Sequence, residues 1–172
     1  MSVVDADHFA LFSLPRRYAL DPDALDAAWK RVCLAVHPDR FATASPAEKR
    51  VAMQWSSRAN EAYRVLRDPL ARARYLCELA GVDLQTETNT AMPAEFLVRQ
   101  MQWHERLDEV QEQSDGAGLA ALAVELASER EALIANLGRL LDQGDYTSAA
   151  AQVREWMFLD RIAAQARAAD PA

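Results

Sequence analysis

His37 and Asp39 are the two side chains whose types and spacing could do chemistry, because a histidine beside a carboxylate can act as a general base. They flank Pro38, which lacks an amide hydrogen and disfavours the helical conformation of the residue before it. The preceding helical pattern should therefore end near His37 and leave the tripeptide in an open loop. No serine or cysteine nucleophile and no glycine-rich phosphate loop accompanies this pair, so we expect no enzyme activity.

A resident metal or cofactor is not predicted either. His8, His37 and His104 are scattered and show no ligand spacing. Cys33 and Cys77 fall inside helical patterns without a CxxC pair, so we expect buried, reduced thiols in a cytosolic protein. A lone histidine at a helix end is usually a cap or a surface residue. A functional role for His37 therefore has to be argued from the residues around it.

Two helices are expected to hold the loop. Asp21 and Pro22 predict the start of the first, and Ser45-Pro46-Ala47-Glu48 has the form of a capping box that starts the second. One face of the first carries Leu25, Ala28, Trp29, Val32 and Val36, and a stripe along the second carries Ala52, Trp55, Ser56, Ala59, Ala62, Tyr63 and Leu66. The two should pack antiparallel with His37 at their common end. A short apolar segment, 8–14, precedes this hairpin, and a helix over 70–80 follows it.

Three further helical patterns fill the rest of the chain, over about 93–113, 119–141 and 145–169. Short loops separate them, which favours antiparallel neighbours. A leucine seam runs along the middle one, at Leu119, Leu122, Leu126, Leu133, Leu137 and Leu140. No strand pattern is visible, so the predicted fold is all α. The expected division is a hairpin domain over 1–80, a polar linker over 81–92 and a three-helix bundle over 93–172.

Charge separates the same two modules. There are 12 Lys and Arg against 10 Asp and Glu up to Gly81, but 7 against 16 from Val82 onward, within a net charge of −7. An acidic chain is a poor ligand for nucleic acid, whose binding depends on basic residues. No run of about 20 apolar residues is present to span a membrane, so we expect a soluble, cytoplasmic protein.

Several apolar residues of the bundle lie off its expected core face. Phe96, Trp103, Leu107 and Val110 share one side of the first bundle helix, whereas Leu97, Val98 and Met101 point elsewhere. Phe158 likewise falls outside the stripe of Val153, Trp156 and Met157 on the last helix. These residues either widen a buried stripe against the first module or form a patch for a protein partner.

The expected hairpin combines His37-Pro38-Asp39, a cationic helix before it and the run from Asn60 to Pro69. In this combination it resembles a J-domain. It implies that His37, Pro38 and Asp39 dock on an ATP-driven chaperone of the HscA/DnaK class and stimulate its ATP hydrolysis. Lys30 and Arg31 match the basic docking face in kind, and Arg40 stands where Lys is frequent.

Four short stretches are spread over nearly the whole chain: His8 to Pro15, His37 to Phe41, Pro69 to Ala73 and Phe158-Leu159-Asp160. Through them the chain is similar to the HscB family of iron-sulfur co-chaperones. It implies an L-shaped protein whose bundle binds an IscU-type cluster assembly scaffold. The binding patch would be Leu97, Met101 and Phe158, with Val98, His104 and Glu105 beside it. Met101 stands where Leu is common, and His104 replaces a basic residue, which weakens the implied ion pairing. The cysteine-rich zinc extension of some eukaryotic members is absent, which favours a bacterial-type protein.

The predicted function is therefore to bind this scaffold and deliver it to a dedicated chaperone. Two alternatives stay open at this point. One is a general J-domain co-chaperone that delivers unfolded clients, although the chain lacks the Gly/Phe-rich segment and cysteine repeats of such proteins. The other is a helical interaction protein in which His37 is incidental.

Overall fold

A computed structural model describes residues 7–41, 43–84 and 92–169 of this chain, and their regular structure is entirely helical. This confirms the predicted all-α class. The chain divides into two compact units, Met1–Leu76 and Cys77–Ala172, with the division inside the fourth helix. Most of the expected linker, residues 85–91, lies outside the described residues.

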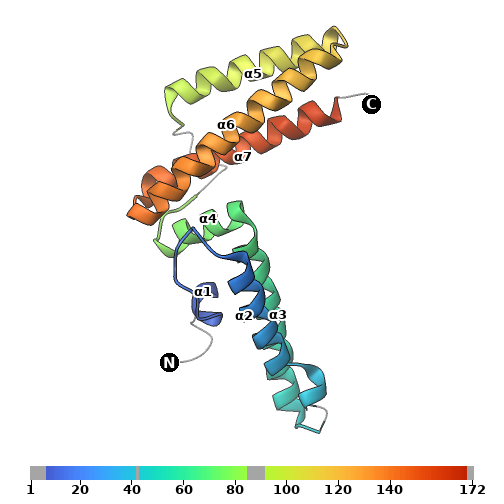
Figure 1. Cartoon of the computed structure of the whole chain (residues 1–172), viewed down its shortest axis with the longest axis vertical. Coiled ribbons are helices and arrows are strands. Elements are labelled where there is room, and N and C mark those ends of the chain that lie inside the picture. The colour runs from blue at the N-terminus through green and yellow to red at the C-terminus, as the bar shows by residue number, and fades with distance from the viewer. Residues whose placement is uncertain (1–6, 42, 85–91, 170–172) are drawn as a thin grey trace. The chain divides into compact units, whose positions relative to one another are not determined.

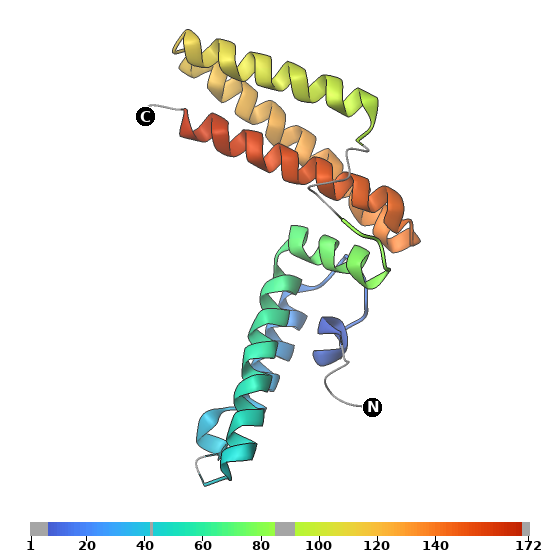
Figure 2. The same ribbon diagram turned by 180° about the vertical axis from the view of Figure 1, so that it is seen from behind.

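The first unit is built around a helical hairpin. Its elements are α1 (His8–Leu11), α2 (Pro22–Ala35), the short 3-10 helix η2 (Pro38–Phe41), α3 (Pro46–Arg67) and the start of α4 (Pro69–Leu79). Figures 1 and 2 both show α2 and α3 side by side along their length, with η2 at the end where they are joined. Within the apolar segment 8–14, the helix ends at Leu11, and Ser13 adopts a left-handed φ of 57° that a helix cannot contain.

Local capping starts both hairpin helices where the sequence predicts. The Asp21 side chain accepts a hydrogen bond from the amide of Asp23, with Pro22 at the first helical position. The capping box at α3 is complete, since the Ser45 hydroxyl accepts from the Glu48 amide and the Glu48 carboxylate accepts from the Ser45 amide. These bonds satisfy amides that have no partner inside the helix, so the loop between α2 and α3 has defined ends.

Small residues and polar contacts join α2 to α3. The buried residues of the two helices are Leu25, Ala28, Ala52, Ala59, Ala62 and Leu66. Trp29 stacks on Tyr63 with ring centroids 4.6 Å apart, and its indole N–H donates to the side-chain oxygen of Asn60 at 3.0 Å. The Tyr63 hydroxyl donates to Asp26 at 2.8 Å. The apolar interface between α2 and α3, here called the hairpin seam, therefore buries mostly small side chains, and hydrogen bonds supplement its packing.

The second unit is an antiparallel bundle of α5 (Ala94–Glu112), α6 (Gly116–Gln143) and α7 (Tyr146–Ala168), as predicted (Figure 1). α6 begins before the predicted Leu119, because the Asp115 side chain accepts from the amide of Gly118. The leucine seam is buried as expected except at its end, where Leu141 is buried and Leu140 only half-buried. Val110 of the expected α5 core face is also half-buried.

The two cysteines lie in helices and carry free thiols, but only Cys77 is buried. Cys33 is half-buried, contrary to the expectation for both, because it lies beside the packed face of α2 rather than on it. Burial raises the pKa of both thiols, which keeps them neutral and weakly reactive. Within the part of the chain that the structure describes, no helix has the length and apolarity to cross a membrane, and no cluster of side chains could hold a metal ion.

Candidate functional site

The His37-Pro38-Asp39 stretch lies at the joined end of the hairpin, where Pro38 opens η2. The backbone amide of Arg40 donates to the carbonyl of His37 at 3.0 Å, which closes the turn. The side chains of His37 and Asp39 are 54% and 90% exposed. The predicted open loop is thus a short helical turn that presents both side chains to solvent.

The imidazole of His37 is oriented by the residue two positions on. Its Nδ1 accepts a hydrogen bond from the Asp39 amide at 3.3 Å, and the same nitrogen lies 3.5 Å from the Asp39 carboxylate. Because Nδ1 faces inward to Asp39, Nε2 is the ring nitrogen that this turn can offer to a partner, beside the exposed carboxylate of Asp39.

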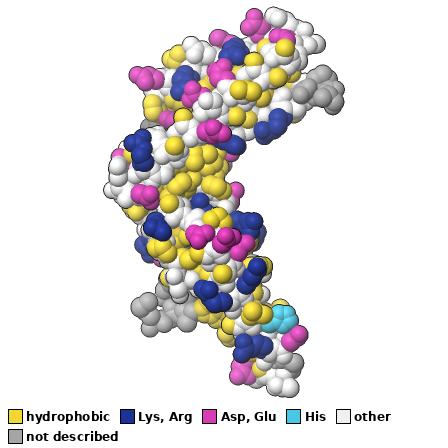
Figure 3. Space-filling model, in the orientation of Figure 1, with side chains coloured by type: hydrophobic (Ala, Val, Ile, Leu, Met, Phe, Trp, Pro, Cys, Tyr) yellow, Lys and Arg dark blue, Asp and Glu magenta, His cyan; other side chains and the backbone are white. Residues whose placement is uncertain are grey.

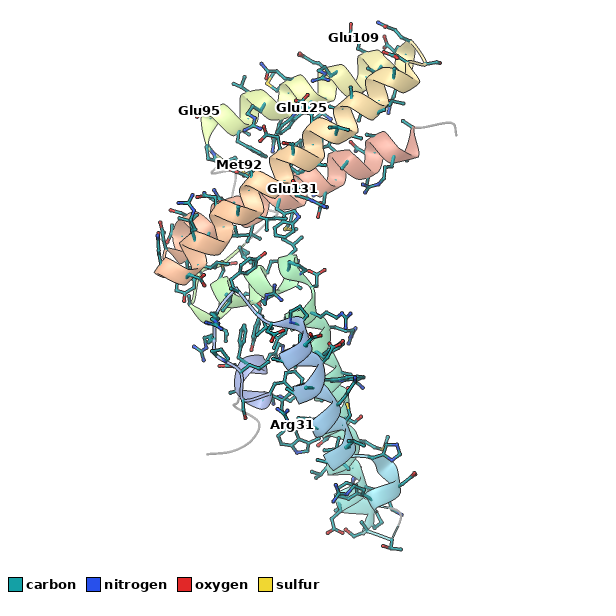
Figure 4. The ribbon with its side chains drawn as sticks, viewed as in Figure 1. Arg31, Met92, Glu95, Glu109, Glu125 and Glu131 are labelled. Carbon is teal, nitrogen blue, oxygen red and sulfur yellow. The ribbon has the colours of Figure 1, made fainter. Side chains whose placement is uncertain are left out.

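Basic side chains lie on α2 before this turn and within η2. Lys30 and Arg31 are exposed on α2, and Figure 4 shows Arg31 on that helix. Arg40 reaches back to the end of α2, where its guanidinium donates to the carbonyl of Leu34 at 3.5 Å. Figure 3 shows Lys and Arg side chains over this face of the hairpin, with a histidine near its end. The structure thus places the six residues predicted for chaperone binding on one half of the hairpin.

In the second unit, Leu97, Val98 and Met101 lie on α5 with exposed fractions of 42%, 55% and 63%. Large apolar side chains are rarely left in water together on one helix without a partner. They are separated from the buried face of α5, which carries Phe96, Trp103 and Leu107. The structure therefore does not pack these three residues into the bundle core.

Phe158 is placed differently from those three. It is half-buried on α7. Its ring meets Phe96 edge-on with the ring centroids 5.7 Å apart, and it stacks on Trp103 with the centroids 6.4 Å apart. His104, exposed on α5, contacts the same ring edge-on at 5.5 Å. Phe158 is thus held by aromatic side chains of α5 while part of its ring faces solvent.

A polar brace fixes Trp103 from the other side. The indole N–H donates to Glu125 of α6 at 2.9 Å, and Arg106 pairs with the same carboxylate. Figure 4 shows Glu125 on α6 where it faces α5. The hydrogen bond from Trp103, followed by the contacts of Arg106, lowers the pKa of Glu125. Sequence reasoning missed this brace, because only the packing of α5 on α6 brings these residues together.

Glu105 lies on the α6 side of α5, in a polar groove that Arg99, Gln102, Trp103 and Arg106 also line. Arg99 places its guanidinium 4.8 Å from the Trp103 ring centre and pairs with Glu129 of α6. His104 and Glu105 are thus neighbours one turn beyond Met101, with His104 against Phe158 and Glu105 in this polar groove.

Comparison with known proteins adds to this geometry. Residues 92–167 match the family model described as the HSCB C-terminal oligomerisation domain. The chain is 59% identical over 167 residues to a curated Bordetella petrii protein, "Co-chaperone protein HscB homolog", a match that covers 96% of this chain and 97% of that one. It is similar over 95% of its length to the structure of the chaperone HscB from Vibrio cholerae, with 32% identity, a TM-score of 0.78 and 96% of that chain covered.

A human structure has a similar fold at a lower sequence identity. The human co-chaperone protein HscB matches over 95% of this chain and 82% of its own, with a TM-score of 0.85 at 24% identity. That likeness shows the fold alone. The similarity to the Bordetella protein covers nearly both whole chains, and it includes both the exposed histidine turn and the aromatic bundle. The chain belongs to the HscB family of co-chaperones.

Proposed function

We propose that this co-chaperone binds an IscU-type iron-sulfur assembly scaffold on its bundle and delivers it to a chaperone of the HscA/DnaK class, whose ATPase it stimulates. The observation that carries the proposal is the exposed His37–Asp39 turn at the end of a capped hairpin, in a chain of a co-chaperone family. A co-chaperone acts through a chaperone of the Hsp70 kind. No catalytic step by this chain is part of the proposal.

The hairpin half of the proposal, residues 1–80, rests on a turn that offers fixed groups to a partner. The Nε2 of His37 and the carboxylate of Asp39 stand two residues apart on a turn that the bond from the Arg40 amide to the His37 carbonyl closes. Lys30, Arg31 and Arg40 would steer an acidic partner surface toward them. If the turn binds the hydrolysis-competent conformation of the chaperone more tightly than the other conformations, it raises the population of that conformation.

The bundle half, residues 93–172, rests on an apolar surface with a rigid anchor. Leu97, Val98 and Met101 supply exposed apolar area, and Phe158 supplies a ring already held by Phe96 and Trp103. Apolar and aromatic side chains of this kind dominate binding energy at interfaces. His104 and Glu105 flank the patch, where they would choose among partners rather than supply most of the affinity.

The chaperone contact is tested by His37→Gln. Glutamine keeps a hydrogen-bonding side chain but not the imidazole, so the variant should lose most of the stimulation of the chaperone's steady-state ATPase. Val51→Ala, an exposed apolar residue of α3 outside the proposed site, is the matched control and should stimulate like the unchanged protein. Normal stimulation by His37→Gln would show that the histidine is incidental.

The scaffold contact is tested by Leu97→Ala combined with Phe158→Ala. The double variant should bind the scaffold at least about tenfold more weakly in calorimetry, because it removes the anchor and part of the apolar area. It should still stimulate the chaperone in the absence of scaffold. Val124→Ala, also exposed on the bundle, is the control. Unchanged scaffold affinity would contradict the site, and displacement of scaffold by unfolded peptides would instead favour a general client-delivering co-chaperone.

A further inference from the structure

Three aromatic rings meet where α5 faces α7, and a partner can reach only one of them. Phe96 and Trp103 of α5 are buried, with exposed fractions of 6% and 3%, whereas Phe158 of α7 is half-buried. Phe96 and Trp103 meet edge-on with the ring centroids 6.0 Å apart, and both contact Phe158. Trp103 is too deeply buried to touch a partner, so it can act on binding only through its neighbours.

The orientation of Trp103 is set from α6. Its indole N–H donates to the carboxylate of Glu125 at 2.9 Å. A buried indole N–H without an acceptor costs free energy, so this hydrogen bond selects the ring position in which the N–H points to α6. In that position the indole stacks on Phe158 with an angle of 25° between the ring planes. The bond to α6 therefore decides which ring surface α5 offers to Phe158.

Two arginines of α5 complete the polar brace. Arg99 and Arg106 lie four residues before and three residues after Trp103, so all three share one face of α5. Arg106 pairs with Glu125, while Arg99 lies 4.8 Å from the Trp103 ring centre and pairs with Glu129, one turn along α6. The indole is thus held both at its N–H and over its ring, and the carboxylates of α6 hold both supports.

From this geometry we infer that Trp103 and Glu125 are positioning residues for the scaffold contact, because the polar brace holds Phe158 in its half-exposed position. The inference rests on the proposed scaffold contact and adds two residues that do not touch the partner. A side chain that must be ordered when a partner binds lowers the affinity. Phe158 avoids this loss, because its ring already stacks on a fixed indole.

The brace could instead serve only to fasten α5 to α6. A fastening acts on the stability of the bundle, and it would affect every patch residue of α5 alike. A positioning role acts on the ring of Phe158, so its effect on binding must depend on that ring being present. Coupling between the brace and Phe158 distinguishes the two roles.

Two substitutions of Glu125 test the hydrogen bond. Glu125→Leu removes the acceptor, and the scaffold should bind about fivefold more weakly in calorimetry. Glu125→Gln keeps an acceptor for the indole and should restore most of the affinity. Glu131→Leu makes the same change at an exposed glutamate of α6 and should bind like the unchanged protein; Figure 4 shows both glutamates on this helix. Equal affinities of the Leu and Gln variants at position 125 would overturn the inference.

Trp103→Phe repeats the test from the other side of the hydrogen bond. A phenyl ring keeps an apolar contact but has no N–H to donate, so binding should weaken about as much as in Glu125→Leu. The two changes together should weaken it no more than either alone, because both break the same bond. This variant also replaces Glu125→Leu if circular dichroism shows that the latter does not fold. Full affinity in Trp103→Phe would contradict the positioning role.

A cycle with Phe158→Ala measures the coupling. Once the ring is absent, adding Glu125→Leu should change the scaffold affinity by less than about twofold. If the loss stayed at fivefold in that background, the brace would act by another route and the inference would fail.

Aromatic NMR spectra recorded without scaffold give a readout that does not need the partner. The ring current of the indole displaces the signals of Phe158, which Phe158→Ala assigns by their loss. In Glu125→Leu these signals should move toward those of an exposed phenylalanine, whereas in Glu125→Gln they should stay in place. Unmoved signals in Glu125→Leu would show that the brace does not set the ring position.

The same measurements separate this inference from the proposed function. If the unchanged protein binds the scaffold, Phe158→Ala weakens binding and Glu125→Leu does not, then the scaffold contact stands and the brace has no part in it. If the unchanged protein does not bind the scaffold, both ideas are overturned together.

Discussion

The hairpin and the bundle are held together in different ways. Along the outer half of the hairpin, the buried residues of α3 are alanines, and the links to α2 are a stacked Trp29–Tyr63 pair and hydrogen bonds. In the bundle, the buried positions of α6 are all leucines, which pack against aromatic and aliphatic residues of α5 and α7. Apolar area therefore dominates the stability of the bundle, and caps and polar contacts carry a larger share in the hairpin.

This difference in packing matches the kind of surface that each unit exposes to solvent. The hairpin exposes a polar turn whose shape comes from local hydrogen bonds, so it does not need a thick core at that end. The bundle exposes Leu97, Val98 and Met101, which are separated from its own core. Because the bundle core is already well packed, α5 can carry exposed apolar side chains on its outer face without rotating to bury them.

Loss of a bundle leucine should give the largest effect. Leu122 is completely buried on α6, so Leu122→Ala should lower the free energy of unfolding by about 3 kcal/mol. Val124→Ala, two residues along the same helix and 71% exposed, should change it by less than about 0.5 kcal/mol. Urea titration measures the loss, and hydrogen exchange with mass spectrometry locates it. If exchange rose equally in the hairpin, the two units would not be independent as the comparison requires.

Removal of one hydroxyl should test the polar seam of the hairpin. Tyr63→Phe keeps the ring on Trp29 but removes the O–H that donates to Asp26 and accepts from Arg67. We expect a loss of about 1 kcal/mol, seen as faster hydrogen exchange in α2 and α3 but not in α6. Tyr146→Phe at the start of α7 is a control outside the hairpin. No change in hairpin exchange would mean that apolar packing alone holds the seam.

A third, more local effect is expected at the capping box. Ser45→Ala removes the acceptor for the Glu48 amide and should cost about 1 kcal/mol. The side-chain hydrogen bond from Ser45, with that from its backbone amide, lowers the pKa of Glu48. A carboxyl group whose pKa is lower in the folded state stabilises that state at any pH above its pKa in the unfolded chain. This stabilisation is lost as the pH falls through the pKa of the folded state. The protection factor of the amides in the first turn of α3, which is corrected for the intrinsic pH dependence of exchange, should therefore fall at acid pH in the unchanged protein and depend less on pH in Ser45→Ala.

The smallest effect is expected at the polar brace of the bundle. The pKa of Glu125 is lowered, so its contribution to stability is present at neutral pH and declines as pH falls below about 4. Glu125→Gln keeps an acceptor for Trp103 but cannot ionise, so the thermal midpoint of the bundle should vary less with pH in this range. Glu131→Gln, exposed on the same helix, should leave the pH dependence unchanged. If the thermal midpoint varied equally with pH in the unchanged protein and in both variants, the polar brace would have no role in the stability of the bundle.

Much of the fold follows from local signals. Asp21 with Pro22, and Ser45 with Glu48, predict helix starts to the residue, because a cap is a bond between positions two or three apart. The end of α2 before Pro38 follows from the same kind of steric rule. The start of α6 was placed too late because Asp115 precedes glycines and an alanine, which carry little periodic signal.

The candidate site could be predicted only in part. The histidine turn was found because its residues are adjacent in the chain, and Leu97, Val98 and Met101 because they break the apolar period of α5. The brace of Trp103 by Glu125 spans two helices, and no pattern links the two residues.

The sequence alone determined the helical class, most helix starts and the polar turn at the end of the hairpin. Those features depend on bonds and steric limits among residues that are neighbours in the chain. Only the tertiary structure decided that Phe158 lies half-buried against Phe96 and Trp103, that Leu141 rather than Leu140 ends the seam, and that Glu125 of α6 holds the indole of Trp103. Each depends on the rotation of one packed helix relative to another, which side-chain volumes on both helices set together.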